Sequence, residues 1–215
     1  MKKIIATTLS GLFIKTAPWK EAHRLWFERI VEQTGDESFR QWVAKTDYFD
    51  GVNLAMARIM PDASKEERVR EARRMFMQQV LGYIKENRES VVNRDVAEFF
   101  RGIRQKYALA LVTTNTRDFI DEILSAAGLS DFFDIIEASP SSEEDDKVAV
   151  FERFVEKNGK PAVYFGGERK DSYDFCRQKN IFCIFANLEG AKEMSVRTAH
   201  NLDEIKEIIQ QIPEG

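Results

Sequence analysis

Hydroxyl side chains and glycines follow directly after three apolar runs of this sequence. The pairs are Thr8 and Ser10, Thr113 and Thr114, and Gly166 and Gly167. A threonine hydroxyl attacks as a nucleophile only beside a base, and Ser10 cannot supply one. Thr113 and Thr114 could bind an anion, or they could satisfy backbone groups at the end of a strand. Gly166 and Gly167 could mark only a tight turn.

Two charged residues stand at the starts of predicted helices. Lys147 follows the acidic patch of residues 143–146, where its simplest role would be local ion pairing. That patch itself is typical of a solvated loop and helix start, where acids are favoured by the helix dipole. Asp171 opens a helix that reaches Lys179, where a helix N-cap is one possible role.

Histidines and cysteines give no clear catalytic pattern. His23 and His200 are the only histidines and lie far apart in the sequence, so a metal pair or a Ser-His arrangement is not favoured. Cys176 and Cys183 do not form a CxxC motif. We interpret them as buried thiols of a reducing compartment rather than as a disulfide or a metal site.

Composition limits the class of protein. The 215 residues are 43% hydrophobic and 32% charged, which suits a packed core and a soluble surface. The net charge of −4 gives no electrostatic case for nucleic acid or an anionic membrane. No apolar run approaches the ~20 residues of a membrane span, and Thr7, Thr8, Ser10 and Lys15 interrupt the N-terminal run too early for a signal peptide. We therefore expect a cytoplasmic protein.

The chain alternates apolar strands with helices outside one long helical region. Strands are predicted at Lys3–Thr8, Ala108–Val112, Phe133–Glu137, Ala162–Phe165, Ile181–Phe185 and Ser195–Arg197. The helical region runs from Pro18 to Lys106, with pieces at Asp36–Lys45, Gly51–Met60, Ser64–Asn87 and Asp95–Gln105. Later helices are predicted at Arg117–Ala127, Asp146–Asn158, Asp171–Lys179 and Leu202–Gln211.

This alternation predicts an α/β fold with a doubly wound parallel sheet. Such sheets are buried on both faces and bind ligands at the carboxyl ends of their strands. Thr8, Thr113 and Gly166 all fall at or just past predicted strand ends. These three positions are therefore where a functional site is expected.

The order of these segments resembles the haloacid dehalogenase-like superfamily of phosphohydrolases. The resemblance covers nearly the whole chain and is strongest from Leu109 to Phe182. It implies a Rossmann-like core from residues 1–16 and 92–215, with residues 17–91 inserted as an all-helical cap. Members use one aspartate as nucleophile, a second acid as acid/base, a hydroxyl and a lysine to hold the phosphoryl group, and further acids to hold Mg²⁺.

The resemblance places Thr8 at the nucleophile and Ser10 at the acid/base, with Gly11 keeping the family's glycine. A shift of one residue would place Thr7 and Leu9 there instead, and neither is a carboxylate. Thr113 (with Thr114 beside it) matches the phosphate-binding hydroxyl, and Lys147 matches the lysine. Gly167 replaces the first metal acid, whereas Asp171 matches the second.

Three functions remain open on this comparison. The first is a relative without phosphatase activity that binds phosphate or a phosphorylated small molecule, or serves as a protein-interaction surface. The second is an active phosphatase-like hydrolase with an altered Mg²⁺ site around Asp171, Glu168 and Asp174. The third is a structural partner protein with no ligand. We favour the first, and Mg²⁺ binding is doubtful because three of the four carboxylates are absent.

Overall fold

The computed structural model describes residues 2–42, 48–140 and 145–212. The chain divides into two compact units. One is formed by Met1–Lys15, Val92–Ser139 and Asp145–Gly215, and the other essentially by Thr16–Val91.

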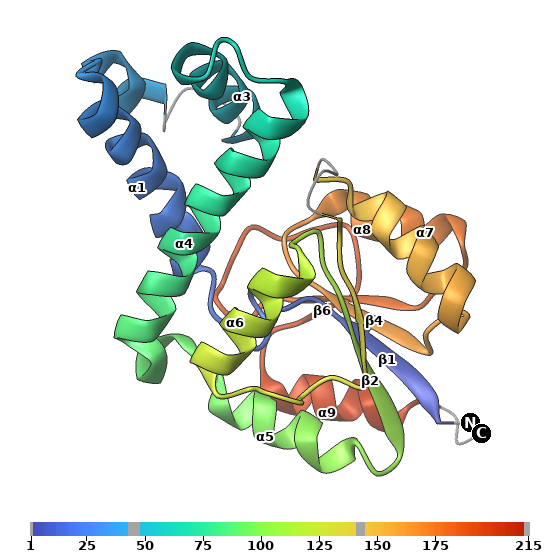
Figure 1. Cartoon of the computed structure of the whole chain (residues 1–215). Coiled ribbons are helices and arrows are strands. Elements are labelled where there is room, and N and C mark those ends of the chain that lie inside the picture. Colours follow the sequence, from blue (N-terminus) through green and yellow to red (C-terminus); the bar gives the residue numbers. More distant parts are fainter. Residues whose placement is uncertain (1, 43–47, 141–144, 213–215) are drawn as a thin grey trace. The chain divides into compact units, whose positions relative to one another are not determined.

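A six-stranded parallel sheet forms the centre of the first unit (Figure 1). Its strand order is β3-β2-β1-β4-β5-β6. The strands are β1 (Lys3–Thr7), β2 (Tyr107–Val112), β3 (Ile135–Glu137), β4 (Val163–Gly166), β5 (Cys183–Ala186) and β6 (Thr198–Ala199). Strand β1 pairs with β2 on one side and with β4 on the other. The predicted fold class, a doubly wound parallel sheet with flanking helices, is confirmed.

Helices cover both faces of this sheet. They are α5 (Arg94–Ile103), α6 (Arg117–Ala127), α7 (Lys147–Asn158), α8 (Lys170–Gln178) and α9 (Leu202–Gln210). Successive residues of a strand point to opposite faces. Accordingly, Tyr164 packs against Phe151 of α7, whereas its neighbour Phe165 packs against Phe100 of α5. Figure 1 shows α7 and α8 together on one side of the sheet, and α5 and α9 on the other.

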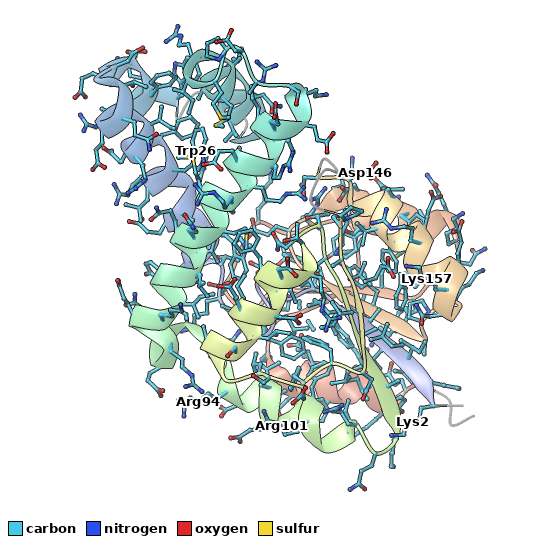
Figure 2. The ribbon with its side chains drawn as sticks, in the orientation of Figure 1. Lys2, Trp26, Arg94, Arg101, Asp146 and Lys157 are labelled. Atoms are coloured by element: carbon cyan, nitrogen blue, oxygen red, sulfur yellow. The ribbon has the colours of Figure 1, made fainter. Side chains whose placement is uncertain are left out.

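The second unit is helical. Its elements are α1 (Ala17–Thr34), the 3₁₀ helix η1 (Glu37–Gln41), α3 (Tyr48–Ile59) and α4 (Lys65–Val91). Trp26, which Figure 2 labels on α1, packs in a core with Phe27, Ile30, Phe39 and Met75. Helix α4 begins with the predicted capping box, in which the Ser64 N–H donates to Glu67 and the Glu67 N–H donates to Ser64 Oγ.

Two predicted elements differ from the structure. The helix expected at Asp36–Lys45 is a 3₁₀ helix over Glu37–Gln41, and residues 43–47 lie outside the described residues. The last strand is Thr198–Ala199 instead of Ser195–Arg197. Its pairing with β5 joins Thr198 to Phe185 and Ala199 to Ala186, so that the buried Ala199 rather than Val196 lies in the sheet.

In the described part of the chain, no helix combines the length and the apolar character that a membrane crossing requires.

Candidate functional site

The residues that follow β1, β2 and β4 lie at one edge of the sheet. These three strands are parallel neighbours, so their carboxyl ends meet there. Thr8, Thr113 and Gly167 each stand directly after one of them. The Thr8 N–H donates to Phe165 O at 2.9 Å, which joins the first loop to β4. The three predicted strand-end segments therefore come together.

The loop after β1 is a compact turn. Leu9 O accepts hydrogen bonds from the N–H groups of Phe13 and Ile14, both at 3.1 Å, and the Gly11 N–H donates to Ile14 O at 2.7 Å. Gly11 has a φ of 81°, which a residue with a side chain adopts at a cost. This conformation explains why a glycine stands at position 11.

Thr7 and Thr8 point to different environments. Thr7 is 0% exposed and donates its hydroxyl to Ala110 O of β2 at 3.1 Å, inside the sheet. Thr8 is partly exposed beyond the end of β1. Ser10 is also partly exposed, whereas Leu9 is buried. Thr8 and Ser10, rather than Thr7 and Leu9, are thus the more accessible pair.

Thr113 is buried and partly engaged by its own loop. Its Oγ1 accepts hydrogen bonds from Asn115 N at 3.2 Å and Asn115 Nδ2 at 3.3 Å. The predicted backbone-satisfying role is thus present. A hydroxyl still has its own hydrogen to donate, so binding an anion is compatible with these contacts. Thr114 is partly exposed beside it.

Lys147 is the first residue of α7 and is only 4% exposed. Its Nζ donates to Val112 O, the residue before Thr113, and lies 5.8 Å from the centre of the Tyr164 ring. Among the residues that the structure describes, no carboxylate oxygen lies within ion-pair distance of this nitrogen. Two of the four preceding acids, Glu143 and Glu144, lie outside the described residues, so the local ion pairing of Lys147 stays a prediction.

Described acids near Lys147 in the sequence contact other groups. Asp146 is the N-cap of α7 and accepts a hydrogen bond from Ala149 N at 3.0 Å. Figure 2 labels Asp146 at this end of the helix and Lys157 near the other. Lys157 forms an ion pair with Glu137 at 3.0 Å. Glu143 and Glu144 lie outside the described residues.

Gly166 and Gly167 form a tightly packed turn after β4. A Cβ added at Gly166 would lie 2.7 Å from Tyr173 Oη and 2.8 Å from Tyr164 Cε1. A Cβ at Gly167 would lie 3.1 Å from Ser10 O. Tyr173 Oη also donates to Gly167 O at 2.6 Å. The turn therefore does more than reverse the chain, because it brings β4 against the loop that carries Thr8 and Ser10.

Asp171 is held by a neighbouring arginine. Its Oδ2 lies 2.6 Å from Arg169 Nη2, and its Oδ1 lies 3.2 Å from Arg169 Nε. Arg169 Nη1 contacts Asp145 Oδ2, so one guanidinium joins two carboxylates. The N-cap of α8 is Arg169 rather than Asp171, which lies in the first turn and accepts from Ser172 N at 2.8 Å. The predicted capping role of Asp171 is therefore wrong.

Burial and neighbouring charges together shift the pKa values of Asp171 and Lys147. Burial alone would raise the pKa of Asp171, but the hydrogen bond and charge of Arg169 outweigh it and lower that pKa. Burial is also the largest influence on Lys147, followed by repulsion from Arg169, and lowers its pKa to about 7. Asp145 and Asp171 oppose this change only partly. Keeping Lys147 protonated at this site therefore costs free energy.

These residues do not fit a Mg²⁺ ion. Magnesium prefers several oxygen ligands, commonly carboxylates. Both oxygens of Asp171 face Arg169, and Asp174 pairs with Arg177 at 3.1 Å. Within residues 2–42, 48–140 and 145–212, no group of three or more His, Cys, Asp or Glu side chains could hold a metal ion.

Sequence reasoning missed Arg169 and Asp145. The sequence places Asp145 in a patch typical of a solvated loop and indicates no role for Arg169. The available signal was the position of Arg169, two residues before Asp171 in a segment expected to bind a cation. The contact with Asp145, 24 residues away, depends on how the loops after β3 and β4 meet. No sequence pattern indicates that contact.

None of the cysteines and histidines is among the residues that directly follow β1, β2 and β4. Cys176 is buried, whereas Cys183 is only partly buried, contrary to prediction, because it begins β5 near the edge of the core. Both are free thiols, and a hydrogen bond from Cys176 lowers the pKa of Cys183 to about 7. His23 and His200 fall in different units.

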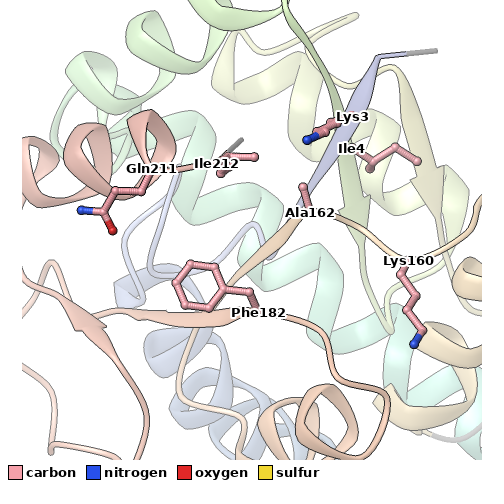
Figure 3. A pocket seen from close by; sticks show the side chains of 7 residues that line it. All are labelled: Lys3, Ile4, Lys160, Ala162, Phe182, Gln211 and Ile212. Atoms are coloured by element: carbon pink, nitrogen blue, oxygen red, sulfur yellow. The ribbon is translucent and has the colours of Figure 1, made fainter. Parts of the chain in front are cut away.

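A cavity of about 460 Å³ opens at the opposite edge of the sheet, where β1, β4 and β5 begin (Figure 3). Its lining residues are Lys3, Ile4, Lys160, Ala162, Phe182, Gln211 and Ile212. None of the predicted site residues lines it. Because it contains two lysines, it is an alternative place for an anion, which any binding experiment must distinguish from the strand-end site around Lys147.

Comparison with known proteins places the fold in context. A family model of haloacid dehalogenase-like hydrolases matches residues 7–171. A haloacid dehalogenase-like hydrolase from Streptococcus pneumoniae has a TM-score of 0.63 at 14% identity and covers 97% of this chain and 98% of its own. The magnesium-bound HAD-hydrolase YfnB from Bacillus subtilis also scores 0.63, at 13% identity, covering 97% of this chain and 99% of its own.

A third similar structure is CbbY from Rhodobacter sphaeroides in complex with phosphate. Its TM-score is 0.59 at 15% identity, and the match covers 93% of this chain and 94% of that one. At such identities these structures show a shared fold only. No curated protein matches the chain in sequence.

Proposed function

Because this chain belongs to the haloacid dehalogenase-like hydrolase family, we propose that it binds phosphate or a phosphorylated small molecule without hydrolysing it. The site is the carboxyl edge of the sheet around Thr8, Thr113 and Lys147. In this proposal residues 17–91 are the family's helical cap domain, and residues 1–16 and 92–215 are its core domain. In the same proposal the protein acts in the cytoplasm, and a protein partner could recognise its phosphate-bound form.

The absence of reactive groups supports the loss of hydrolysis. Thr8 stands where the family places its nucleophilic aspartate, and Ser10 where it places the acid/base. Without an aspartate at the nucleophile position no aspartyl phosphate forms. Neither hydroxyl can attack phosphorus or activate water without a neighbouring base. Removal of a nucleophile from a tuned site costs roughly a million-fold in rate. Gly167 brings no carboxylate, and the one at Asp171 is bound to Arg169.

The observation that carries the binding proposal is the buried ammonium of Lys147. Its described partners are a backbone carbonyl and an aromatic ring, neither of which neutralises a positive charge. A buried charge is costly unless it is paired. A phosphoryl anion beside Val112 and Thr113 would provide that partner. The Thr113 hydroxyl hydrogen could donate to the same anion.

Phosphate should therefore stabilise the folded protein. At a phosphate concentration one hundred times its dissociation constant, we expect the free energy of unfolding to rise by about 2.7 kcal/mol. Thermal unfolding with increasing phosphate measures this shift. Lys147→Met should abolish the shift, because methionine fills the same space without a charge.

Lys160→Ala is the matched control. It removes an exposed lysine from the cavity at the opposite edge, so the phosphate shift should persist if the anion binds beside Lys147. Loss of the shift in Lys160→Ala alone would move the anion to that cavity and contradict the proposed site.

The same preparations should not release phosphate from 4-nitrophenyl phosphate in the presence of Mg²⁺. Turnover that requires Mg²⁺ and falls in Asp171→Ala would identify an active hydrolase instead. No stabilisation by any anion, together with co-purification of a protein partner, would favour an interaction protein without a ligand.

A further inference from the structure

The side chain of Arg169 is fixed between two carboxylates at the site. Its Nε and Nη2 face the two oxygens of Asp171, at 3.2 and 2.6 Å, and its Nη1 contacts Asp145. Arg169 Nη2 also lies 3.5 Å from Asp145 O. A planar guanidinium matches a carboxylate in this two-pronged way, which fixes its orientation as well as its charge.

Asp171 is the one acid at this edge that matches the family's metal-binding positions. Both its oxygens accept hydrogen bonds from Arg169, and Oδ1 also accepts one from Ser172 N. A divalent cation would have to displace the guanidinium to reach these oxygens. It would then lie beside a positive charge that has lost its partners. The arrangement therefore disfavours a metal ion at Asp171.

The guanidinium stands between these acids as a cation would. Its single positive charge offsets one of the two negative charges of Asp145 and Asp171, and its side chain remains 39% exposed. Arg169 also acts on Lys147, whose pKa its charge lowers. Protonated Lys147, to which no described carboxylate is paired, brings the sum of these four charges to zero, so that an anion is not repelled as it would be by the two acids alone.

We propose that Arg169 replaces the divalent cation at this site, so that the site binds a phosphoryl anion without any metal. This inference rests on the proposed phosphate-binding function and adds how repulsion between the ligand and the acids of the site is avoided. Arg169 offsets the charge of Asp145 and Asp171, which hold the guanidinium in position, and Lys147 faces the anion.

Two measurements test the proposal. Isothermal titration of inorganic phosphate into the whole protein is carried out once with a chelator and once with Mg²⁺. Manganese binding to the same protein without phosphate is measured by electron paramagnetic resonance. We expect the dissociation constant for phosphate to agree within about twofold in the two titrations, and no Mn²⁺ to bind.

Arginine variants test the role of the charge. Arg169→Met should weaken phosphate binding about tenfold or more, the range of a lost interaction with a charged group. Arg169→Lys, which keeps the charge and leaves fewer orphaned acids, should retain part of the affinity if the methionine variant folds poorly. Arg177→Met is the matched control on α8, because it breaks only the exposed pair with Asp174 and should leave phosphate affinity unchanged.

The outcomes separate the two proposals. Phosphate binding that appears only with Mg²⁺, or Mn²⁺ binding that is lost in Asp171→Asn, would overturn the role of Arg169 while leaving phosphate binding intact. Equal affinity in Arg169→Met and the unaltered protein would overturn it as well. No phosphate binding under either condition would instead overturn the proposed function, and with it the inference that depends on it.

Discussion

Lys147 is surrounded by groups that influence its charge in both directions. Burial is the largest influence and lowers the pKa of the ammonium to about 7, and Arg169 lowers it further. Asp145 and Asp171 raise it, and Cys176 does so to a smaller extent. A lysine with such a pKa changes its protonation state near neutral pH, so both stability and anion binding depend on it.

This lysine should make stability depend on pH in a defined direction. Between about pH 7 and pH 10 the unfolded chain keeps a lysine proton that the folded chain has released. The unfolded state therefore binds more protons, and the free energy of unfolding rises with pH in this window. Below about pH 7 both states hold the proton, and this dependence disappears.

Urea unfolding of the unaltered protein and of Lys147→Met at several pH values between 7 and 10 measures this effect. Cys183 has a lowered pKa and contributes a rise of its own, so the difference between the two proteins isolates Lys147. We expect the free energy of unfolding of the unaltered protein to rise relative to that of Lys147→Met as the pH rises. Parallel curves would show that Lys147 keeps its ordinary pKa when buried.

The turn between β4 and α8 sets the shape of the site at the scale of an element. Tyr173 of α8 donates to Gly167 O, and its ring lies against the position that a side chain at Gly166 would need. Helix α8 thus fixes the position of the turn, and the turn packs against Ser10 of the loop after β1. A larger side chain at either glycine should therefore displace neighbouring residues at this edge of the sheet.

Gly166→Ala should destabilise the protein by about 1–3 kcal/mol, the usual cost of overpacking. Its added Cβ meets two tyrosine side chains at under 3 Å. Gly102→Ala in α5 is the control, since nothing lies within 4 Å of its added Cβ. Alanine is a better helix former, so this change should stabilise by about 0.5–1 kcal/mol. Chemical denaturation measures both, and equal effects would contradict the packing argument.

Strands and helices with strong patterns were predictable from the sequence. The apolar run at Ala108–Val112 lies within β2, and the helix Arg117–Ala127 matches α6 to the residue. Short polar elements were not predictable from the sequence. Strand β6, for example, has only two residues and pairs only with β5. The 3₁₀ helix at Glu37–Gln41 likewise lacks a period that distinguishes it from an α-helix.

The candidate site was predictable only in part. The gathering of Thr8, Thr113 and Gly167 followed from parallel strands sharing an edge. The burial of Lys147 and the bridge from Arg169 to Asp145 did not, because each depends on contacts between loops distant in sequence. A charged residue near a strand end could face solvent or the site, and sequence alone does not distinguish these orientations.

At the scale of the whole molecule, the family fold and the chemistry of the site lead to different expectations. The family model spans residues 7–171, and the parallel sheet with its helices is shared with family hydrolases. A fold does not determine a function, because function depends on the groups at the site. Here those groups are hydroxyls, a buried lysine and an arginine bound to two acids.

The most direct test is a crystal structure of the protein after incubation with 4-nitrophenyl phosphate and Mg²⁺. The account predicts an intact ester with its phosphoryl group within hydrogen-bonding distance of Lys147 Nζ and Thr113 Oγ1, and Arg169 still joined to Asp145 and Asp171 with no metal. Free phosphate beside a Mg²⁺ ion bound to Asp171, or an anion found only between Lys3 and Lys160, would contradict it.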